Sequence, residues 1–240
     1  MRLLERRSDW KIVLIDVPPD KIPPYAILSH TWGDDEVTFR DMPDGVDNKL
    51  GYEKLWFCAN QVARDGLRYF WVDTCCIDKS SSAELQEAIN SMFRWYANAV
   101  KCYVYLSDVS SASLESVDGS NRLPFESAFR RSRWFTRGWT LQELLAPATV
   151  EFFSKNGGRL GDKKSLERLI CEITGIPKTA LRGTPLYQYT ANERFLWARK
   201  RNTSREEDWA YSLLGIFDVF MPLIYGEGKD RAVSRLRKEF

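Results

Sequence analysis

Four short apolar runs recur along the first two thirds of the chain, separated by polar segments. Each run is apolar on both of its alternating sides, which is typical of strands buried on both faces of a parallel sheet. The runs cover residues 25–29 (YAILS), 69–73 (YFWVD), 102–106 (CYVYL) and 150–153 (VEFF). We also expect an edge strand around residues 11–15.

Helical patterns lie between these runs. Residues 52–64 place their apolar side chains on one side, and Gly66 is suited to end that helix. Ser81 and Glu84 have the spacing of a capping box at the start of a second helix. The apolar positions that follow recur at helical spacing; they are Leu85, Ala88, Ile89, Met92 and Tyr96. The alternation of strands and helices predicts βαβ units.

The second half of the chain changes character. Residues 110–124 are rich in Ser, Asp, Asn and Gly, which predicts an exposed loop. Residues 132–147 (SRWFTRGWTLQELLAP) predict a short helix that Pro147 ends. From residue 162 only helical patterns remain, with capping-box spacings at Thr190/Glu193 and Ser204/Glu207. We therefore expect an α/β core over residues 1–160 and a helical extension over residues 161–240. The basic amphipathic segment at the end lacks a stop signal, so we expect further domains to follow.

Composition limits the possible partners. The 240 residues carry a net charge of +2, which gives no long-range field to attract nucleic acid or an anionic membrane. The apolar run near the amino terminus is short and interrupted by charges, unlike a signal peptide or a spanning helix. We therefore expect a cytoplasmic protein without membrane insertion or nucleic-acid binding. The five cysteines show no framework spacing and are expected to be free thiols.

Several catalytic classes find little support. The chain has a single histidine, His30, so any Ser-His-Asp or Cys-His mechanism would have to use it. The adjacent Cys75 and Cys76 are typical of small buried residues at a strand end. Because the zinc spacings CxxC and HxxxH and the phosphate-loop motifs are absent from the sequence, we expect no metal, no bound cofactor and no nucleoside triphosphatase activity.

Polar residues follow the predicted strands where each one ends. Ser29, His30 and Trp32 lie at or just after the end of the first run, Asp73 at the end of the second and Ser107 directly after the third. Ligands of open α/β sheets bind outside the carboxyl ends of the strands, so we expect these side chains to line one cleft. The alternative is that Asp73 and Ser107 simply cap the helices that follow.

The segment RGWTLQELL supplies the candidate for catalysis. Trp139 and Glu143 are four residues apart and share a helix face. A carboxylate can accept hydrogen bonds from ribose hydroxyls and stabilise a glycosidic centre that becomes positive, while an indole ring stacks on the ligand. The competing interpretation is a core Trp beside a solvated Glu. Four arginines precede this helix and fit either a phosphate-bearing ligand or a solvated basic face; they are Arg130, Arg131, Arg133 and Arg137.

Three blocks of the sequence together resemble the fungal heterokaryon incompatibility (HET) domain. They are PYAILSHTWGDDEVTF, YFWVDTCCIDKSSSAELQEAINSMFRWYANAVKCYVYLSDV and SRWFTRGWTLQELLAP. The likeness is to HET domains at the amino terminus of fungal NLR-like incompatibility proteins. It implies a trigger of programmed cell death, followed in the full-length protein by a nucleotide-binding oligomerisation domain and WD repeats.

HET domains are in turn similar to TIR domains. The stretches YAILSH, FWVDTCCIDKSSSAELQEAI and YVYLSDV resemble TIR strands and a helix, and W-T-L-Q-E-L resembles the W-C-x-x-E-L of TIR enzymes that cleave NAD. The resemblance implies a flavodoxin-like sheet, Glu143 as the catalytic residue, and Trp139 as the conserved Trp. Thr140 departs from the TIR pattern, which has Cys there, and the CCIDK loop departs as well.

Three hypotheses follow for the activity. The first is cleavage of the nicotinamide glycosidic bond of NAD by a self-associated domain. In it Glu143 is catalytic, and Ser29, His30, Trp32, Asp73, Ser107 and Trp139 bind the substrate. The second is a non-enzymatic death adaptor that signals by self-association. The third is an enzyme that acts on another adenine nucleotide, because the motif identifies the carboxylate but not the leaving group.

Overall fold

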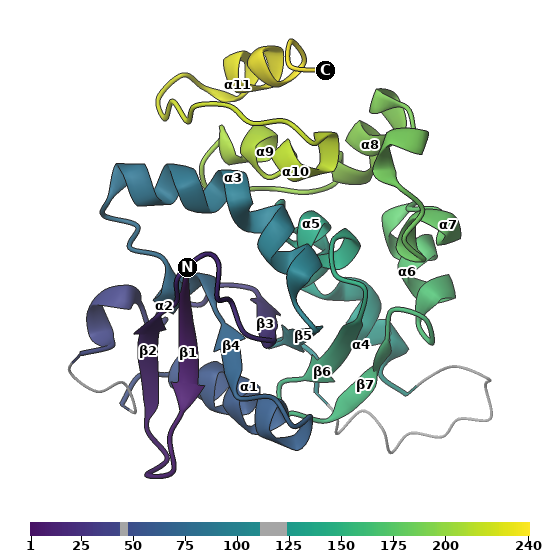
Figure 1. Ribbon diagram of the computed structural model, residues 1–240. Helices are drawn as coiled ribbons and strands as arrows, with labels where there is room; N and C mark the ends of the chain where they lie inside the picture. Colours follow the sequence, from purple (N-terminus) through teal and green to yellow (C-terminus); the bar gives the residue numbers. More distant parts are fainter. Residues whose placement is uncertain (44–47, 111–123) are drawn as a thin grey trace.

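The computed structural model describes residues 1–43, 48–110 and 124–240 and contains one seven-stranded sheet (Figure 1). The strand order is β2-β1-β4-β3-β5-β6-β7. The four central strands, β4, β3, β5 and β6, are parallel, and the outer strands join them antiparallel. The strands are β1 (Arg2–Arg6), β2 (Ile12–Asp16), β3 (Tyr25–His30), β4 (Tyr69–Trp71), β5 (Lys101–Leu106), β6 (Val150–Ser154) and β7 (Arg159–Asp162). In chain order the parallel strands follow the pattern 2-1-3-4, which is the start of the flavodoxin-like order.

The four apolar runs are β3, β4, β5 and β6, and the expected edge strand is β2. The second run ends two residues earlier than predicted, because Asp73 begins a short helix, α2 (Asp73–Cys76). The sequence analysis missed β1 and β7. Each pairs on one side with an apolar strand of the sheet, while its own sequence, RLLER or RLGD, lacks the apolar run by which the inner strands were recognised.

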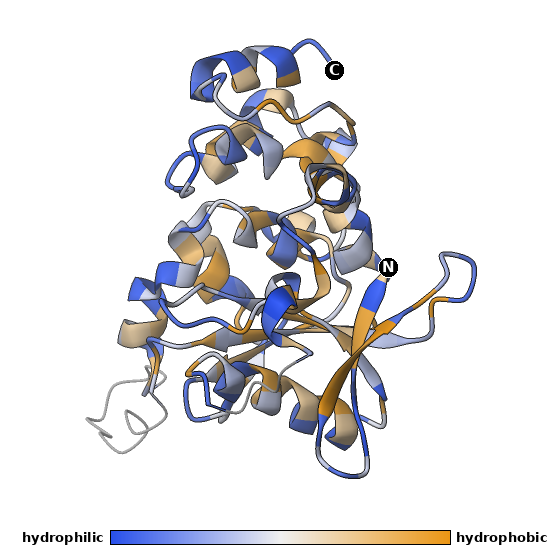
Figure 2. Cartoon of the chain, turned by 90° about the vertical axis from the view of Figure 1, so that its left-hand side faces the viewer, coloured by the Kyte–Doolittle hydropathy of each residue, from blue (hydrophilic) through white to orange (hydrophobic). Residues whose placement is uncertain are grey.

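Helices cover both faces of the sheet, as Figures 1 and 2 show. Helix α1 lies on one face, and α3 and α5 lie on the other (Figure 1). The helical elements up to β6 are η1 (Phe39–Asp41), α1 (Tyr52–Arg64), α2, α3 (Ser82–Asn98), α4 (Glu126–Arg131), η3 (Arg133–Thr136) and α5 (Thr140–Leu145). The expected loop over residues 110–124 lies almost wholly outside the described residues.

After β7 the described chain is helical, as predicted. Its elements are α6 (Glu167–Thr174), α7 (Lys178–Leu181), η4 (Leu186–Gln188), α8 (Ala191–Ala198), α9 (Asp208–Tyr211), α10 (Leu214–Phe217) and α11 (Lys229–Leu236). They stack on α3 and α5, on the side away from α1 (Figure 1). The contact between α10 and α3 is close enough that a Cβ on Gly215 would lie 2.0 Å from Cβ of Phe93.

The predicted capping boxes had different outcomes. Thr190 and Glu193 form a complete box at the start of α8. Ser81 accepts a hydrogen bond from the Glu84 amide, but the Glu84 carboxylate binds the Asp78 amide and Arg2 instead of closing the box. The Ser204/Glu207 prediction was wrong, because Glu207 itself occupies the position before α9. Its carboxylate accepts hydrogen bonds from the amides of residues 226 and 228.

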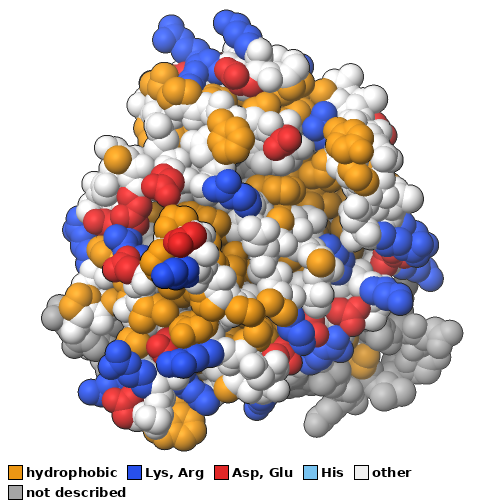
Figure 3. All heavy atoms as spheres, viewed as in Figure 1, with side chains coloured by type: hydrophobic (Ala, Val, Ile, Leu, Met, Phe, Trp, Pro, Cys, Tyr) orange, Lys and Arg blue, Asp and Glu red, His pale blue; other side chains and the backbone are white. Residues whose placement is uncertain are grey.

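On the face shown in Figure 3, acidic and basic side chains are interspersed, in keeping with the small net charge. None of the described helices is both long and apolar enough to cross a membrane.

Candidate functional site

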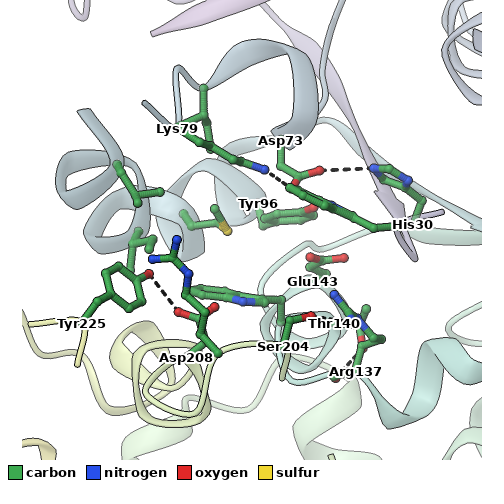
Figure 4. A pocket seen from close by; sticks show the side chains of 17 residues that line it. His30, Asp73, Lys79, Tyr96, Arg137, Thr140, Glu143, Ser204, Asp208 and Tyr225 are labelled. Carbon is green, nitrogen blue, oxygen red and sulfur yellow. Dashed lines mark hydrogen bonds and ion pairs between the residues drawn. The ribbon is translucent and has the colours of Figure 1, made fainter. Parts of the chain in front are cut away.

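A cavity of about 250 Å³ opens at the carboxyl end of the central strand β3 (Figure 4). Strand β3 supplies His30 and the segment after it Trp32, while Asp73 comes from the start of α2. Trp139 and Glu143 reach the cavity from the α5 segment, so five of the seven predicted site residues line one space. The volume is near the lower end of the range of about 300–1,000 Å³ that is usual for small-molecule sites.

Glu143 is buried at this cavity, with 7% of its surface exposed, although a helical Glu is usually solvated. Its carboxylate accepts a hydrogen bond from the hydroxyl of Ser29, which is fully buried in β3. The same Ser29 oxygen accepts a hydrogen bond of 2.8 Å from the indole nitrogen of Trp134. Ser29 therefore lies behind Glu143 and is not one of the residues that line the cavity.

Burial raises the pKa of Glu143 to about 8. The Ser29 hydrogen bond opposes this shift, the negative charge of Asp73 adds to it, and Tyr96 and Arg137 lower it. At neutral pH the Glu143 carboxyl group is therefore mostly protonated. A cationic ligand placed beside it would favour the carboxylate form.

Tyr96 on α3 is the second group on the Glu143 carboxyl, and the sequence analysis took it only for a core residue. Its hydroxyl donates a hydrogen bond of 3.0 Å to the Leu28 carbonyl. Its contact with the Glu143 carboxyl lowers the pKa of Glu143 and raises that of Tyr96, so it favours the carboxylate form of Glu143. Tyr96 therefore opposes the effect of burial on this acid, as Ser29 does.

A row of polar side chains, His30, Asp73 and Lys79, forms the upper wall in Figure 4. Nε2 of His30 lies 3.2 Å from Asp73, and its Nδ1 lies 3.8 Å from Glu36. Lys79 lies 3.1 Å from the other Asp73 oxygen. Although burial raises the pKa of Asp73, Lys79 and His30 hold it well below its ordinary value. Asp73 therefore remains a carboxylate next to the protonated Glu143.

Trp32 and Lys79 form the rim beside this row of side chains. The indole nitrogen of Trp32 donates a hydrogen bond of 3.0 Å to Asp73, and the Lys79 ammonium lies 3.6 Å from the ring centre. Trp32 is 42% exposed, so its orientation is fixed by polar contacts at the mouth and not by burial.

The carboxy-terminal helices supply the opposite wall, and none of its residues was among the predicted site residues. Asp208 at the start of α9 accepts a hydrogen bond of 2.9 Å from Tyr225 and is hydrogen-bonded to the Trp139 side chain. Burial raises the pKa of Asp208, and both hydrogen bonds oppose that rise. Ser204 and Arg205 complete this wall. Nothing in their local sequence distinguishes these residues from surface polar residues.

Backbone pairing fixes the junction between the two walls. The Gly138 amide donates to the Asn202 carbonyl at 2.8 Å, and the Asn202 amide donates to the Thr136 carbonyl at 2.7 Å. The buried Arg201 side chain donates to the Thr140 hydroxyl at 2.7 Å and to the Arg137 carbonyl at 2.9 Å. The start of α5, and with it Glu143, is therefore held by Arg201, which lies 61 residues after Thr140 in the sequence.

The remaining wall is apolar. Leu85, Ile89 and Met92 recur along one side of α3 and line the cavity together with Ile77. The sequence analysis identified the α3 residues as an amphipathic stripe. The stripe covers the cavity as well as the core, so a flat apolar group can lie between α3 and Trp139.

Two predicted groups lie elsewhere. Ser107 does not line the cavity, and its hydroxyl lies 3.4 Å from that of Thr31. Of the four arginines, only Arg137 lines the cavity. Arg130 pairs with Glu126 and Glu172. Arg130 is therefore an ion-paired surface residue, whereas Arg137 is placed where it could contact a ligand.

Across the described ranges, no three His, Cys, Asp or Glu side chains gather in a way that could hold a metal ion. The five cysteines are unpaired in the structure. Burial raises the pKa of Cys75 to about 12, so that thiol is a poor nucleophile.

Two comparisons relate this chain to known proteins. The profile of the family described as heterokaryon incompatibility protein (HET) matches residues 25–130, which include β3 to β5 and all the cavity residues of the sheet. The sequence is 59% identical over 243 residues to the vegetative incompatibility protein HET-E-1 of Podospora anserina. That match covers 100% of this chain but 18% of the relative. No solved structure matches. These matches place the chain in the heterokaryon incompatibility (HET) family.

Proposed function

We propose that this chain is the effector part of a vegetative incompatibility protein and that, once oligomerised, it hydrolyses the nicotinamide glycosidic bond of NAD. The relative that it resembles over its whole length is a vegetative incompatibility protein and is much longer. We propose that the full-length protein likewise carries further domains, and that these control assembly. The cell-death role and the cytoplasmic location belong to the same proposal.

The observation that carries the enzymatic proposal is a buried carboxyl group at the wall of a cavity, beside an indole ring and at a sheet edge where α/β proteins bind ligands. Hydrolysis breaks the bond between the ribose C1′ and the nicotinamide nitrogen. Water supplies the new C1′ oxygen, nicotinamide leaves as a neutral molecule, and one proton is released. A carboxylate next to C1′ stabilises the positive charge that develops as that bond breaks.

The raised pKa of Glu143 fits a cationic substrate. The nicotinamide ring of NAD carries a positive charge, which stabilises the ionised carboxylate when the ring enters the cavity. The Ser29 hydroxyl is already directed at that carboxylate and stabilises the same form. The predicted role of Ser29 then becomes that of a positioning residue, whereas His30, Trp32, Asp73 and Trp139 remain proposed substrate contacts.

The test is nicotinamide release from NAD by the purified chain, at low concentration and after forced dimerisation through a fused domain. Glu143→Gln should lower turnover about 10²-fold or more, by analogy with the loss of one preorganised electrostatic group. Glu126→Gln is the matched control, since Glu126 lies on the surface in a salt bridge with Arg130 and away from the cavity.

Two outcomes would contradict the proposal. If no nicotinamide appears at high protein concentration while expression still kills cells, the domain acts as a non-enzymatic adaptor. If mass spectrometry finds another adenine nucleotide consumed, and NAD untouched, the carboxylate acts on a different leaving group.

A further inference from the structure

The mouth of the cavity carries two arginines that come from distant parts of the chain. Arg137 precedes α5 and Arg205 precedes α9, and both line the cavity. The pairing of residues 136–138 with Asn202 brings them to the same rim. Because Arg137 and Arg205 are so far apart in the sequence, no local motif could have predicted that they lie together.

Neither guanidinium group lies within ion-pair distance of a carboxylate among the residues that the structure describes, although Arg137 lowers the pKa of Glu143 and the charge of Arg205 opposes the rise in the pKa of Asp208. Within that part of the chain, no ion pair within 4.0 Å involves Arg137 or Arg205, although Arg130, Arg159 and Arg182 are all paired. Arg137 has only a long contact of 3.5 Å to the Ser204 hydroxyl, and Arg205 lies over the Tyr225 ring at 4.2 Å. Both groups therefore keep several donors that a ligand can use.

The charges around the cavity favour an anion at this rim. Lys79 is neutralised by Asp73 across the mouth, and Glu143 is mostly protonated at neutral pH. Asp208 is the remaining acid of the lining, and its oxygens already accept hydrogen bonds from Tyr225 and Trp139. The lining therefore carries three cationic side chains against two carboxylates, which is an excess of one positive charge while Glu143 is protonated.

The shape of the cavity indicates how much of a ligand is enclosed. A volume of about 250 Å³ suits a nucleoside-sized group, so a dinucleotide would extend past the rim. The guanidinium group of an arginine can donate two parallel hydrogen bonds to the oxygens of one phosphate. A diphosphate attached to the enclosed ribose would present such oxygens at the rim.

We infer that Arg137 and Arg205 form a diphosphate-binding subsite at the mouth of the cavity, and that the ligand of this domain is a nucleotide with at least two linked phosphates. The inference rests on the proposed function for the identity of the enclosed group, but not for the anion site itself. It assigns to the carboxy-terminal helices a direct part in ligand binding.

The experiment is calorimetric titration of the purified chain with ADP, AMP and adenosine, none of which has a nicotinamide bond to cleave. ADP should bind at least about tenfold more tightly than adenosine, as expected for charge-assisted hydrogen bonds. The variants Arg137→Ala and Arg205→Ala should each remove most of that advantage, and added salt should weaken ADP but not adenosine. Arg133→Ala is the matched control, because Arg133 is an exposed arginine of the same segment that does not line the cavity.

The outcomes separate this inference from the proposed function. Equal binding of ADP and adenosine, no binding of either, or an Arg205→Ala variant that behaves like Arg133→Ala would overturn the diphosphate subsite. Arginine-dependent ADP binding without nicotinamide release would support the subsite and contradict NAD hydrolysis. Nicotinamide release with the same KM for NAD in all three arginine variants would support NAD hydrolysis and contradict the subsite. Since Arg137 uses its backbone carbonyl for its structural contacts, both alanine variants should keep the parental melting temperature.

Discussion

Ser29 donates a hydrogen bond to Glu143 from the central strand of the sheet, across a separation of 114 residues. The serine has no solvent contact, and its second partner is the Trp134 indole nitrogen. This arrangement fixes the carboxyl group from behind and leaves its other side toward Tyr96 and the cavity. A serine that the sequence suggests as a ligand contact thus orients the acid that faces the ligand.

Replacing Ser29 by alanine should move the pH dependence of nicotinamide release. The hydroxyl lowers the pKa of Glu143, so its loss should raise that pKa further above about 8. A smaller fraction is then ionised at neutral pH, and the rising limb of kcat/KM against pH should shift to higher pH. The lost partner of Trp134 should also cost about 1–3 kcal/mol of stability, measured by urea unfolding.

The matched control for that variant is Ser107→Ala. Ser107 also follows a central strand, but it does not line the cavity or contact Glu143. The Ser107→Ala variant should leave the rising part of the kcat/KM–pH profile at the parental pH. If the folded Ser29→Ala variant also keeps the parental profile, Ser29 does not affect the pKa of Glu143.

The Glu143→Gln variant should differ from the parent in how stability depends on pH. Because the pKa rises from 4.5 to about 8 on folding, the folded state binds more protons than the unfolded state between those values. The free energy of unfolding of the parent should therefore fall as pH rises through this window, by a few kcal/mol at most. The amide of the variant cannot ionise, so the variant should gain stability relative to the parent from about pH 5 to pH 8.

Urea unfolding of both proteins at several pH values measures this difference. The free energy of unfolding of the variant minus that of the parent should increase with pH up to about pH 8 and then level off, because Glu143 is ionised in both states above that pH. If this difference stays constant or decreases as pH rises toward 8, Glu143 is not a buried acid with a raised pKa.

Trp139 offers a test of stacking against hydrogen bonding. Trp139→Phe keeps an aromatic ring but loses the hydrogen bond to Asp208, whereas Trp139→Ala loses both. If the ring stacks on the ligand, the alanine variant should raise KM for NAD about tenfold or more, since base–aromatic stacking contributes about 1–3 kcal/mol. The phenylalanine variant should raise KM much less. Equal effects would assign the role to the hydrogen bond.

The sequence predicted the inner sheet well because burial on both faces leaves a local signature. Residues 25–29 and 102–106 are apolar throughout, so β3 and β5 needed no tertiary information. The outer strands β1 and β7 gave no such signal, since part of each faces solvent. Their place is set by pairing with β4 and β6.

The site was predictable only in its amino-terminal half. His30, Trp32 and Asp73 lie at or just after the carboxyl ends of strands, where the topology of α/β folds makes polar residues informative, and Glu143 was identified through a motif. Asp208 and Arg205 carry no comparable signal, because they approach the cavity only through the packing of the carboxy-terminal helices on α3 and α5. The local pattern at Ser204 and Glu207 even suggested a capping box, whereas Glu207 binds the backbone near Gly226.

The close approach of Gly138 to Thr203 allows a test of whether the carboxy-terminal part of the chain supports the site. A Cβ on Gly138 would lie 2.4 Å from Cγ2 of Thr203, so Gly138→Ala should separate the two segments and destabilise the fold by about 1–3 kcal/mol. It should also lower nicotinamide release, because Arg201 and Asn202 would no longer hold the start of α5.

Thr203→Ser removes the clashing methyl group and keeps the hydroxyl that donates to the Arg205 carbonyl. The double variant should therefore recover stability in urea unfolding and also recover activity, while Thr203→Ser alone should resemble the parent. Recovery of stability without recovery of activity would separate the packing of this junction from the function of Glu143.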